Sequence, residues 1–418
     1  MNGETILWVA AHDWNSLWRG EQQLALRIAA QNRVIYFQPD RATDESALSA
    51  IARKLPNLFQ LHAQPLHQEF VLVPTPPALP VARKFLPRAL LQATTPAIVK
   101  INASMLIRQI RRAMTDFKIT EPILWLSSPY HCDLVGKFSE KLSCYYVYDE
   151  AADFTANIRI RELLLRCDEC VSARVNVIFA TSRAQCERRT PLNPNTHLVA
   201  NGVDFELFNG ALTSNLPLPA DMERIPGPII GFAGWLGYHI DVHLLREVAE
   251  AYPGCSLVLV GPDHLPHSKD AALLRSLSNV FFLGQKDLAE LPRYMAAFDV
   301  ALMPWQLAGH IWSAYPLKLH EYLAAGRAIV ATALPELTPF NHLLRIAHTH
   351  QEFISCVADS LQDHAPAAVQ SRVAAARENT WDHRVADIYR ILESLLENRS
   401  IGGSESSEWR GDSREPRS

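Results

Sequence analysis

The sequence of 418 residues has neither a long apolar run nor a strong excess of charge of one sign. No stretch approaches the roughly 18 apolar residues that indicate a membrane-spanning helix. The 40 Lys and Arg residues nearly balance 44 Asp and Glu residues, and the net charge is −4. The chain as a whole therefore creates no field that would attract nucleic acid, and we expect neither a membrane span nor a nucleic-acid partner.

Cysteine is scarce as well. The seven cysteines are odd in number and scattered, which does not suit a disulfide framework. The start of the chain has no basic leader, and its apolar run ends at His12 and Asp13, so we expect a protein of the reducing cytoplasm. Cys167 and Cys170 form a C-x-x-C, but no second pair or nearby histidine completes a zinc site. We interpret these two cysteines as structural residues of a helix.

Apolar runs alternate with helical patterns along most of the chain. Between residues 228 and 332, short β-rich runs that are apolar on both faces alternate with amphipathic helices. This pattern is typical of a doubly wound parallel sheet, and the first half repeats it less regularly. We therefore expect an α/β protein with two Rossmann-like doubly wound parallel-sheet domains that face a central cleft.

The expected boundaries follow from composition. Residues 1–205 form the N-terminal domain, 206–227 a linker without periodicity, and 228–380 the C-terminal domain. Residues 381–399 predict a helix that packs back toward the N-terminal domain. Residues 400–418 contain too few apolar side chains to bury a core, so we expect a disordered tail.

A short, mostly apolar helical segment carries two charged residues, Lys318 and Glu321. Pro316 suits its first position and Gly326 its C-terminal cap. A lysine in the first turn opposes the helix dipole and needs compensation. Two interpretations stay open. The two charges form a surface ion pair, or Lys318 binds a phosphate while the carboxylate of Glu321 accepts hydrogen bonds from sugar hydroxyls.

The dinucleotide fingerprint G-x-G-x-x-G is absent, which disfavours a nicotinamide enzyme. Gly234 and Gly237 instead lie in a loop between a predicted strand and a predicted helix. Small residues there allow backbone amides and the helix dipole to approach a phosphate. Glycines at such turns also occur for packing reasons alone, so this loop is weak support.

Four segments occur together in one order: NGVDFELF, NVFFLGQKDLAELPRYMAAFDVALMPW, SAYPLKLHEYLAAGRAIVAT and TWDHRV. In this order and spacing they resemble the cytoplasmic glycosyltransferases of GT-B type, especially family 4. The resemblance covers residues 1–398 and is most specific from 228 to 332. The segment WNSLWRGEQQLALRIAAQNRVIYFQP is similar to the opening of a bacterial branch that builds surface polysaccharides.

This resemblance implies a nucleotide-sugar donor on the C-terminal domain and an acceptor held largely by the N-terminal domain. Glu321 matches the family carboxylate that holds the donor ribose. Gly284 and Gln285 match the loop beside the nucleobase, and Gly234 matches the turn near the diphosphate. The resemblance implies no further cofactor and no metal, because the nucleotide-sugar is a co-substrate.

Two positions depart from the family pattern. Ser313 stands eight residues before Glu321, where the family often has a second glutamate, so the contact to the donor sugar and the retaining or inverting outcome stay open. Trp235 lies in the loop that usually carries an Arg and a Lys. Lys318 is our candidate for the missing phosphate-binding cation, with backbone amides of the turn from Gly234 to Gly237.

Glycosyl transfer needs a stabilised leaving diphosphate, and an inverting enzyme also needs a base. The candidates follow strands of the N-terminal domain. We rank Asp149 and Glu150 first, then His131 and Asp13. Each of them has loop capping or a core hydrogen bond as its alternative role.

Residues 71–115 contain seven Lys and Arg residues and no acidic residue. Their helical apolar spacing is typical of an element that lies on an anionic membrane surface, although a solvated helix packed on the sheet has the same pattern.

The function we expect is transfer of a sugar from a nucleotide-diphosphate-sugar to a saccharide or lipid-linked saccharide in cell-envelope or exopolysaccharide biosynthesis. The alternatives are a nucleotide-sugar epimerase of the same fold and a catalytically inactive nucleotide-binding relative.

Overall fold

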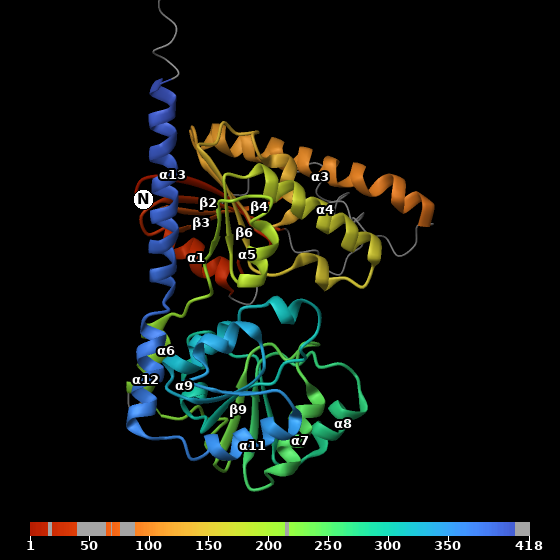
Figure 1. Ribbon diagram of the computed structural model, residues 1–418, viewed down its shortest axis with the longest axis vertical. Helices are drawn as coiled ribbons and strands as arrows, with labels where there is room; N and C mark the ends of the chain where they lie inside the picture. Colours follow the sequence, from red (N-terminus) through yellow and green to blue (C-terminus); the bar gives the residue numbers. More distant parts are fainter. Residues whose placement is uncertain (16–18, 40–63, 68, 76–87, 214–216, 406–418) are drawn as a thin grey trace, which may run out of the picture.

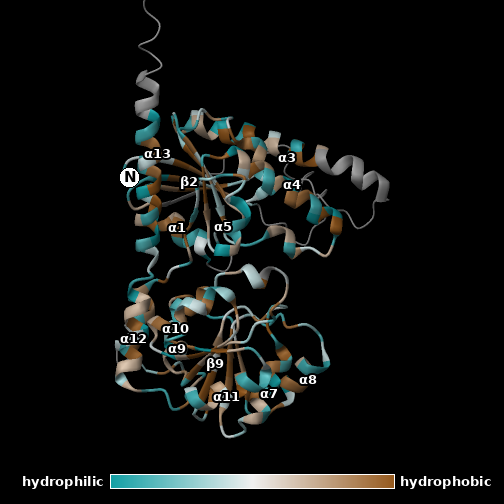
Figure 2. Ribbon diagram, viewed as in Figure 1, coloured by the Kyte–Doolittle hydropathy of each residue, from teal (hydrophilic) through white to brown (hydrophobic). Residues whose placement is uncertain are grey.

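Two α/β domains follow one another along the long axis of the molecule (Figure 1). This computed structural model describes residues 1–15, 19–39, 64–67, 69–75, 88–213 and 217–405. Each domain has a buried parallel sheet with helices on both faces, so the expected fold class is confirmed. Apolar residues concentrate in the strands and on the inner sides of the helices (Figure 2).

The N-terminal sheet has the strand order β3-β4-β2-β1-β5-β6-β7-β8, and β3 alone pairs in the antiparallel sense. Its strands are β1 (Thr5–Val9), β2 (Arg33–Gln38), β3 (Gln64–His67), β4 (Phe70–Pro74), β5 (Ile123–Leu126), β6 (Leu142–Val147), β7 (Val177–Ala180) and β8 (Thr196–Leu198). Six of them lie where the apolar runs predict strands. The pattern did not predict β3 and β4, and β4 occupies the start of the basic segment 71–115.

Alternate residues of the central strand serve two different cores. Ile6 and Trp8 of β1 pack with helices α1 (Gly20–Ile28) and α13 (Trp381–Glu405). Leu7 and Val9 point to the other face, which is covered by α3 (Arg88–Asp116), the 3-10 helix η2 (Pro129–Leu134) and α4 (Ile158–Arg174). Both faces are apolar because both are buried, as expected for a parallel sheet.

The C-terminal sheet has six parallel strands in the order β11-β10-β9-β12-β13-β14. They are β9 (Ile229–Ala233), β10 (Ser256–Val260), β11 (Val280–Gly284), β12 (Val300–Met303), β13 (Ala328–Thr332) and β14 (Arg345–Ala347), of which only β14 was not predicted. The helices of this half are α6 (Phe205–Thr213), α7 (Val242–Ala251), α8 (Lys269–Ser276), α9 (Leu291–Ala296), α10 (Leu317–Ala324), α11 (His350–Ser360) and α12 (Pro366–Arg377). Shorter elements are η3 (Ala151–Phe154), α5 (Arg183–Arg189), η4 (Gly309–Ser313) and η5 (Pro335–Phe340).

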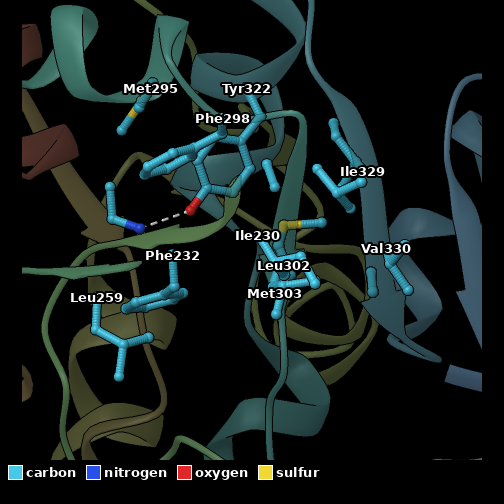
Figure 3. Close-up of a cluster of buried hydrophobic side chains, with 14 of the residues drawn as sticks. Ile230, Phe232, Leu259, Met295, Phe298, Leu302, Met303, Tyr322, Ile329 and Val330 are labelled. Atoms are coloured by element: carbon cyan, nitrogen blue, oxygen red, sulfur yellow. Dashed lines mark hydrogen bonds between the residues drawn. The ribbon is translucent and has the colours of Figure 1, made fainter. Parts of the chain in front are cut away.

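The core around β9 fixes the helix that carries the two unexpected charges (Figure 3). The hydroxyl of Tyr322 in α10 accepts a hydrogen bond of 2.9 Å from the backbone N–H of Ala233, the last residue of β9. A Cβ atom on Gly231 would lie 2.2 Å from the ring of Phe298, so only glycine fits there. The bond from Ala233 to Tyr322 holds α10 against the carboxyl end of β9.

The chain crosses between the domains at two adjacent points. Val203 donates a backbone hydrogen bond to Asn379, and Trp381 donates one to Val203. Helix α13 then runs along the N-terminal domain beside α1 (Figure 1), where Trp381 and Ile388 are buried in its core. The C-terminal helix therefore packs back on the first domain.

Two expectations about connecting segments need correction. Residues 206–227 are not a structureless linker, because α6 lies among them and Phe208 and Met222 join the core of the C-terminal domain. Residues 400–405 continue α13, whereas we expected them to start a disordered tail. The remainder of that tail, 406–418, lies outside the described residues.

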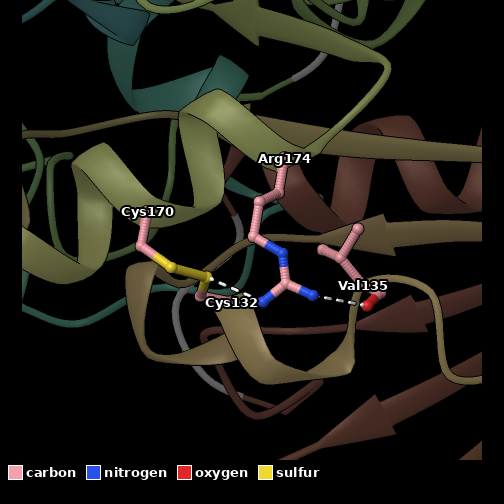
Figure 4. Close-up of a disulfide and its surroundings, with 4 residues drawn as sticks. All are labelled: Cys132, Val135, Cys170 and Arg174. Carbon is pink, nitrogen blue, oxygen red and sulfur yellow. Dashed lines mark hydrogen bonds between the residues drawn. A yellow bond between two sulfur atoms is a disulfide. The ribbon is translucent and has the colours of Figure 1, made fainter.

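Cys132 of η2 and Cys170 of α4 form a disulfide with an S–S distance of 2.04 Å (Figure 4). Arg174, one turn further along α4, donates hydrogen bonds to Cys132 Sγ and to the carbonyl oxygen of Val135. The expectation of reduced cysteines is wrong for this pair, because packing of α4 on η2 brings together residues that are 38 positions apart. Cys167 is a free thiol.

The apolar face of α3 belongs to the protein core. Its described part buries Leu106 and Ile110 against the sheet and exposes Lys100, Arg108, Arg111 and Arg112. This described part of the face is therefore unavailable to a bilayer. Residues 76–87 and the side chains of residues 88–96 lie outside the described part. Among the helices described, none combines the length and the apolar character that a bilayer crossing requires.

Candidate functional site

A cavity of about 610 Å³ lies between the two domains. Its walls are loops at the carboxyl ends of strands in both sheets, where open parallel sheets bind ligands. The N-terminal domain contributes His12, Arg19, Tyr130, Tyr148, Asp149, Ala151, Phe154 and Leu164, and the C-terminal domain contributes Trp235, Tyr238, His239, Trp305, Ile311, Ala314 and Pro316. Of the residues predicted for the site, the cavity thus contains Asp149 and Trp235.

Asp149 follows β6 and is the carboxylate that lines the cavity. Burial raises its pKa to about 7, although the nearby guanidinium of Arg19 acts in the opposite direction. A carboxyl group with this pKa is divided between its two protonation states near neutral pH. It can therefore accept a proton from, or hydrogen-bond to, a substrate hydroxyl.

Arg19, the cation in this wall, was not predicted. It precedes the first turn of α1, and its Nε atom has no hydrogen-bond partner among the described residues although it is buried. A buried guanidinium nitrogen without a partner is costly. An anionic group of a bound substrate would supply the missing acceptor.

His12 and Glu21 form a second feature that sequence reasoning missed. Glu21 is buried and accepts hydrogen bonds from the indole of Trp8 and from the backbone N–H groups of Ala11 and His12. The Nδ1 atom of His12 lies 3.1 Å from the same carboxylate. Because an ionised carboxylate only accepts, Nδ1 carries the proton and Nε2 of a neutral His12 is free to accept one. Glu21 lies in a segment with an ordinary helical pattern of apolar residues. Nothing in the local sequence indicates that its carboxylate binds His12.

The structure separates the other predicted acid–base candidates from the cavity lining. Glu150 is buried in ion pairs with Arg188 and Arg189. Burial lowers the pKa of His131 to about 4 and keeps its ring neutral. Asp13 accepts a hydrogen bond of 2.8 Å from the backbone of Asn15, as a turn residue does.

The C-terminal wall begins at the loop after β9. Trp235 stacks on His239, with ring centroids 5.2 Å apart, and meets Tyr238 edge-on. A Cβ atom on Gly237 would lie 2.6 Å from the Trp235 ring, so this glycine allows the indole to fold over its own loop. The position where the resemblance predicts an Arg and a Lys is thus occupied by an aromatic cluster.

Lys318, Glu321 and Gly234 lie together. Lys318 Nζ is 2.7 Å from Glu321 Oε2, and both side chains are largely buried. A Cβ atom on Gly234 would lie 3.1 Å from Lys318 Cε, so the lysine stem covers this turn. The neighbouring Pro316 lines the cavity. An ammonium group, a carboxylate and a glycine turn therefore meet at the cavity's edge.

The ends of α10 differ slightly from expectation. Pro316 is the N-cap of the helix and not its first residue. Gly326 has φ +68° and donates to Leu323, while Arg327 donates to Tyr322. These two bonds form a Schellman motif, which ends the helix as the glycine predicts.

The remaining predicted donor residues lie near the same sheet edge. Gly284 ends β11 with φ +69° and accepts a backbone bond from Gly261, next to the end of β10. Gln285 follows it and is exposed, whereas Ser313 ends η4 and is buried. None of these three lines the cavity as described.

Two Rossmann-like domains with a cavity at their facing strand ends define the GT-B fold. Residues 227–363, most of the C-terminal domain, match the family described as "Glycosyl transferases group 1". This part of the chain is therefore similar to that family in its sequence, in addition to having the GT-B fold.

The chain is similar to TuaH of Bacillus subtilis (strain 168), a protein named as a glycosyltransferase of teichuronic acid biosynthesis. The two are 34% identical over 139 residues, which is 33% of this chain and 34% of TuaH. The match thus spans about a third of that relative's length.

Solved structures share the fold over almost the whole chain. Sucrose-phosphate synthase from Thermosynechococcus elongatus superposes with a TM-score of 0.67 at 17% identity, over 94% of this chain and 100% of that one. The Anabaena protein HepE, solved with UDP and glucose, has a TM-score of 0.61 at 14% identity, with 94% and 100% coverage. A trehalose-6-phosphate protein from E. coli bound with UDP-2-fluoro glucose has a TM-score of 0.65 at 10% identity, with 94% and 99% coverage.

Proposed function

We propose that the protein is a glycosyltransferase that moves a sugar from a nucleotide-diphosphate-sugar to a saccharide or lipid-linked saccharide acceptor. The observation that carries this proposal is the interdomain cavity, which has a raised-pKa carboxyl group on one wall and an ion pair over a glycine turn at the edge of the other. The family match of the second wall supports the same reaction. TuaH carries the name of a transferase in teichuronic acid biosynthesis, so we assign the product to the cell envelope or an exopolysaccharide.

In this proposal the donor lies on the C-terminal wall. Lys318 and the amides of the Gly234 turn bind the diphosphate, and Glu321 accepts hydrogen bonds from the ribose hydroxyls. The HepE and E. coli structures contain UDP or a UDP-sugar, so UDP-sugars come first among the donors to test. The nucleotide-sugar is a co-substrate, and the proposed reaction uses no further cofactor or metal.

The reaction breaks the bond between the anomeric carbon and the diphosphate oxygen, which leaves with the electron pair. A new bond forms between that carbon and an acceptor hydroxyl oxygen, whose proton passes to a base or to the leaving diphosphate. Asp149 is our first candidate for the group that binds this hydroxyl, because its pKa of about 7 suits proton transfer at neutral pH. His12, held by Glu21, is the second.

We also propose a cytoplasmic location with electrostatic attachment to the inner face of the membrane. The exposed cations of α3 support the attachment, since basic side chains near an anionic surface each contribute about 1 kcal/mol. The cysteines do not support the location, because Cys132 and Cys170 form a disulfide. Sedimentation with anionic and neutral liposomes tests this proposal. Equal, negligible binding to both would contradict it, and preferential binding to anionic vesicles would support it.

Product analysis tests the reaction itself. The full chain is incubated with UDP-, GDP-, TDP- and ADP-sugars, with and without a mixture of envelope saccharides, and the nucleotides and sugars released are measured. A transferase releases nucleoside diphosphate in step with glycosylated acceptor. An epimerase would convert the nucleotide-sugar with no acceptor present, and an inactive relative would bind nucleotide without turnover.

A further inference from the structure

A cluster of histidines and carboxylates lies between helices α7 and α11 of the C-terminal domain. His243 and Glu247 are one turn apart on α7, and His350 begins α11. One ligand atom from each lies within 4.8 Å of the others. None of the three lines the interdomain cavity, so the proposed transfer reaction leaves the cluster without a role.

The ligand atoms converge on Glu247. Its Oε2 atom is 2.7 Å from His350 Nδ1, and its Oε1 atom is 3.3 Å from His243 Nε2. Two ligand atoms on one tetrahedral Zn²⁺ are roughly 3.4 Å apart, because each lies about 2.1 Å from the metal. Small side-chain rotations thus suffice to place all three around one ion. A water molecule would complete the four ligands.

Each histidine has a carboxylate on its other nitrogen. His350 Nε2 is 3.0 Å from Asp241 Oδ2, and His243 Nδ1 is 3.3 Å from Asp270 Oδ1. Such outer carboxylates take the N–H of a metal-bound histidine, fix its tautomer and increase its basicity. His350 Nδ1 and His243 Nε2 are the nitrogens that face Glu247. Arg246 Nη2 also lies 3.1 Å from His243 Nδ1, so this nitrogen faces both a carboxylate and a guanidinium.

The charge around the cluster is also suitable for a cation. Asp241, Glu247 and Asp270 place three carboxylates around the two histidines. These carboxylates outweigh the partial positive charge at the first turns of α7 and α11, which by itself disfavours a cation. Arg246 is bound to Asp270 and Glu250.

We propose that His243, Glu247 and His350 form a binding site for Zn²⁺ or a similar late first-row divalent ion, which joins α7 to α11. Imidazole nitrogens favour such ions over Mg²⁺ and Ca²⁺, which prefer oxygen ligands.

The experiment uses the full chain, stripped of metal and titrated with ZnCl₂ by calorimetry, with MgCl₂ as the reference ion. We expect one Zn²⁺ per chain, no comparable Mg²⁺ binding, and a rise in melting temperature with Zn²⁺ concentration. His243→Ala, Glu247→Gln and His350→Ala should each weaken this binding at least about tenfold, and Asp270→Asn about tenfold. His348→Ala is the matched control, since His348 is exposed and lies two residues before His350.

Folding of each variant is checked by its melting temperature without metal. If His350→Ala fails to fold, Co²⁺ absorption of the wild-type chain decides, because nitrogen and oxygen ligands lack the thiolate charge-transfer band that a cysteine site would show. Absence of Zn²⁺ binding, binding that survives both histidine substitutions, or a thiolate band would overturn the proposal.

Discussion

The ammonium group of Lys318 lies 2.7 Å from a carboxylate oxygen of Glu321, and its carbon chain covers the turn at Gly234. The pair offsets the unfavourable position of a lysine in the first turn of α10. The carbon chain of Lys318 lies on the glycine turn beside the cavity. A surface ion pair accounts for the bond between the two side chains, and the proposed donor site predicts in addition that a diphosphate binds at this turn.

Lys318→Ala should weaken binding of a nucleoside diphosphate at least about tenfold, because a charge-assisted bond to phosphate is typically stronger than about 1.5 kcal/mol. Binding of the nucleoside alone should change little. Glu321→Gln should weaken both, since the ribose is common to them. Calorimetry measures each affinity, with Lys269→Ala, at an exposed position at the start of α8, as the control. Equal affinities for all proteins would rule out the donor assignment.

Asp149→Asn should lower the transfer rate strongly, and wild-type activity should rise with pH through about 7 as the carboxyl group ionises. The free energy of unfolding of the wild-type protein should instead fall as pH rises through this range. The folded pKa of about 7 exceeds the ordinary value of an aspartate, 3.8, so the wild-type protein loses stability as pH rises from 4 to above 7. The asparagine variant lacks this loss and should gain, relative to wild type, up to about 4 kcal/mol.

Urea unfolding of both proteins at pH 5 and pH 8 measures that difference. A stability gap that stays constant between the two pH values would show that Asp149 does not titrate in this range. An activity profile shared by wild type and variant would remove Asp149 from proton transfer.

Glu21→Gln should destabilise the protein by about 1–3 kcal/mol, because the amide cannot accept all the bonds that the carboxylate accepts from Trp8, Ala11 and His12. The His12→Asn variant should have nearly the same free energy of unfolding as the wild-type protein. If His12 is the base, the transfer rate of this variant should be about 10²- to 10⁴-fold lower than that of the wild-type protein. His197→Asn, in the same domain but outside the cavity, is the control. An unaltered rate for His12→Asn would leave Asp149 as the sole candidate.

Cys132→Ser should lower the free energy of unfolding by about 3–4 kcal/mol, as should reduction of the wild-type protein. This value follows from the loop of 38 residues that the disulfide closes. Cys186→Ser, a free and half-buried thiol, is the control. Denaturant unfolding with and without reductant measures both differences in the free energy of unfolding. If reductant does not change the free energy of unfolding of the wild-type protein, the disulfide is contradicted.

Strong apolar runs account for what the sequence revealed of the fold. The central strands, buried on both faces, produce a continuous signal that local reading detects. β3 reads QPLH and has no apolar run, so local reading could not detect it. β4 is an apolar run of five residues that was counted only as the start of the basic segment 71–115. β14 has three residues and carries Arg345, so it offers no comparable run.

The site was harder to predict because its parts are far apart in the chain. Asp149 emerged from its position after a strand, and Trp235 emerged as a departure from the pattern of the resembled family. Glu21 and the partners of His350 did not, since their roles depend on helices packing against loops 9 to 109 residues away. The Cys132–Cys170 pairing was hidden for the same reason.

The most direct test is a thermal-shift screen of the full chain against UDP-, GDP-, TDP- and ADP-sugars, repeated with the Lys318→Ala/Glu321→Gln double variant. The account predicts that at least one nucleotide-sugar raises the melting temperature of the wild-type protein. The same compound at the same concentration should leave the folded double variant unshifted. A wild-type protein that no nucleotide-sugar stabilises, or a double variant stabilised as strongly as wild type, would contradict it.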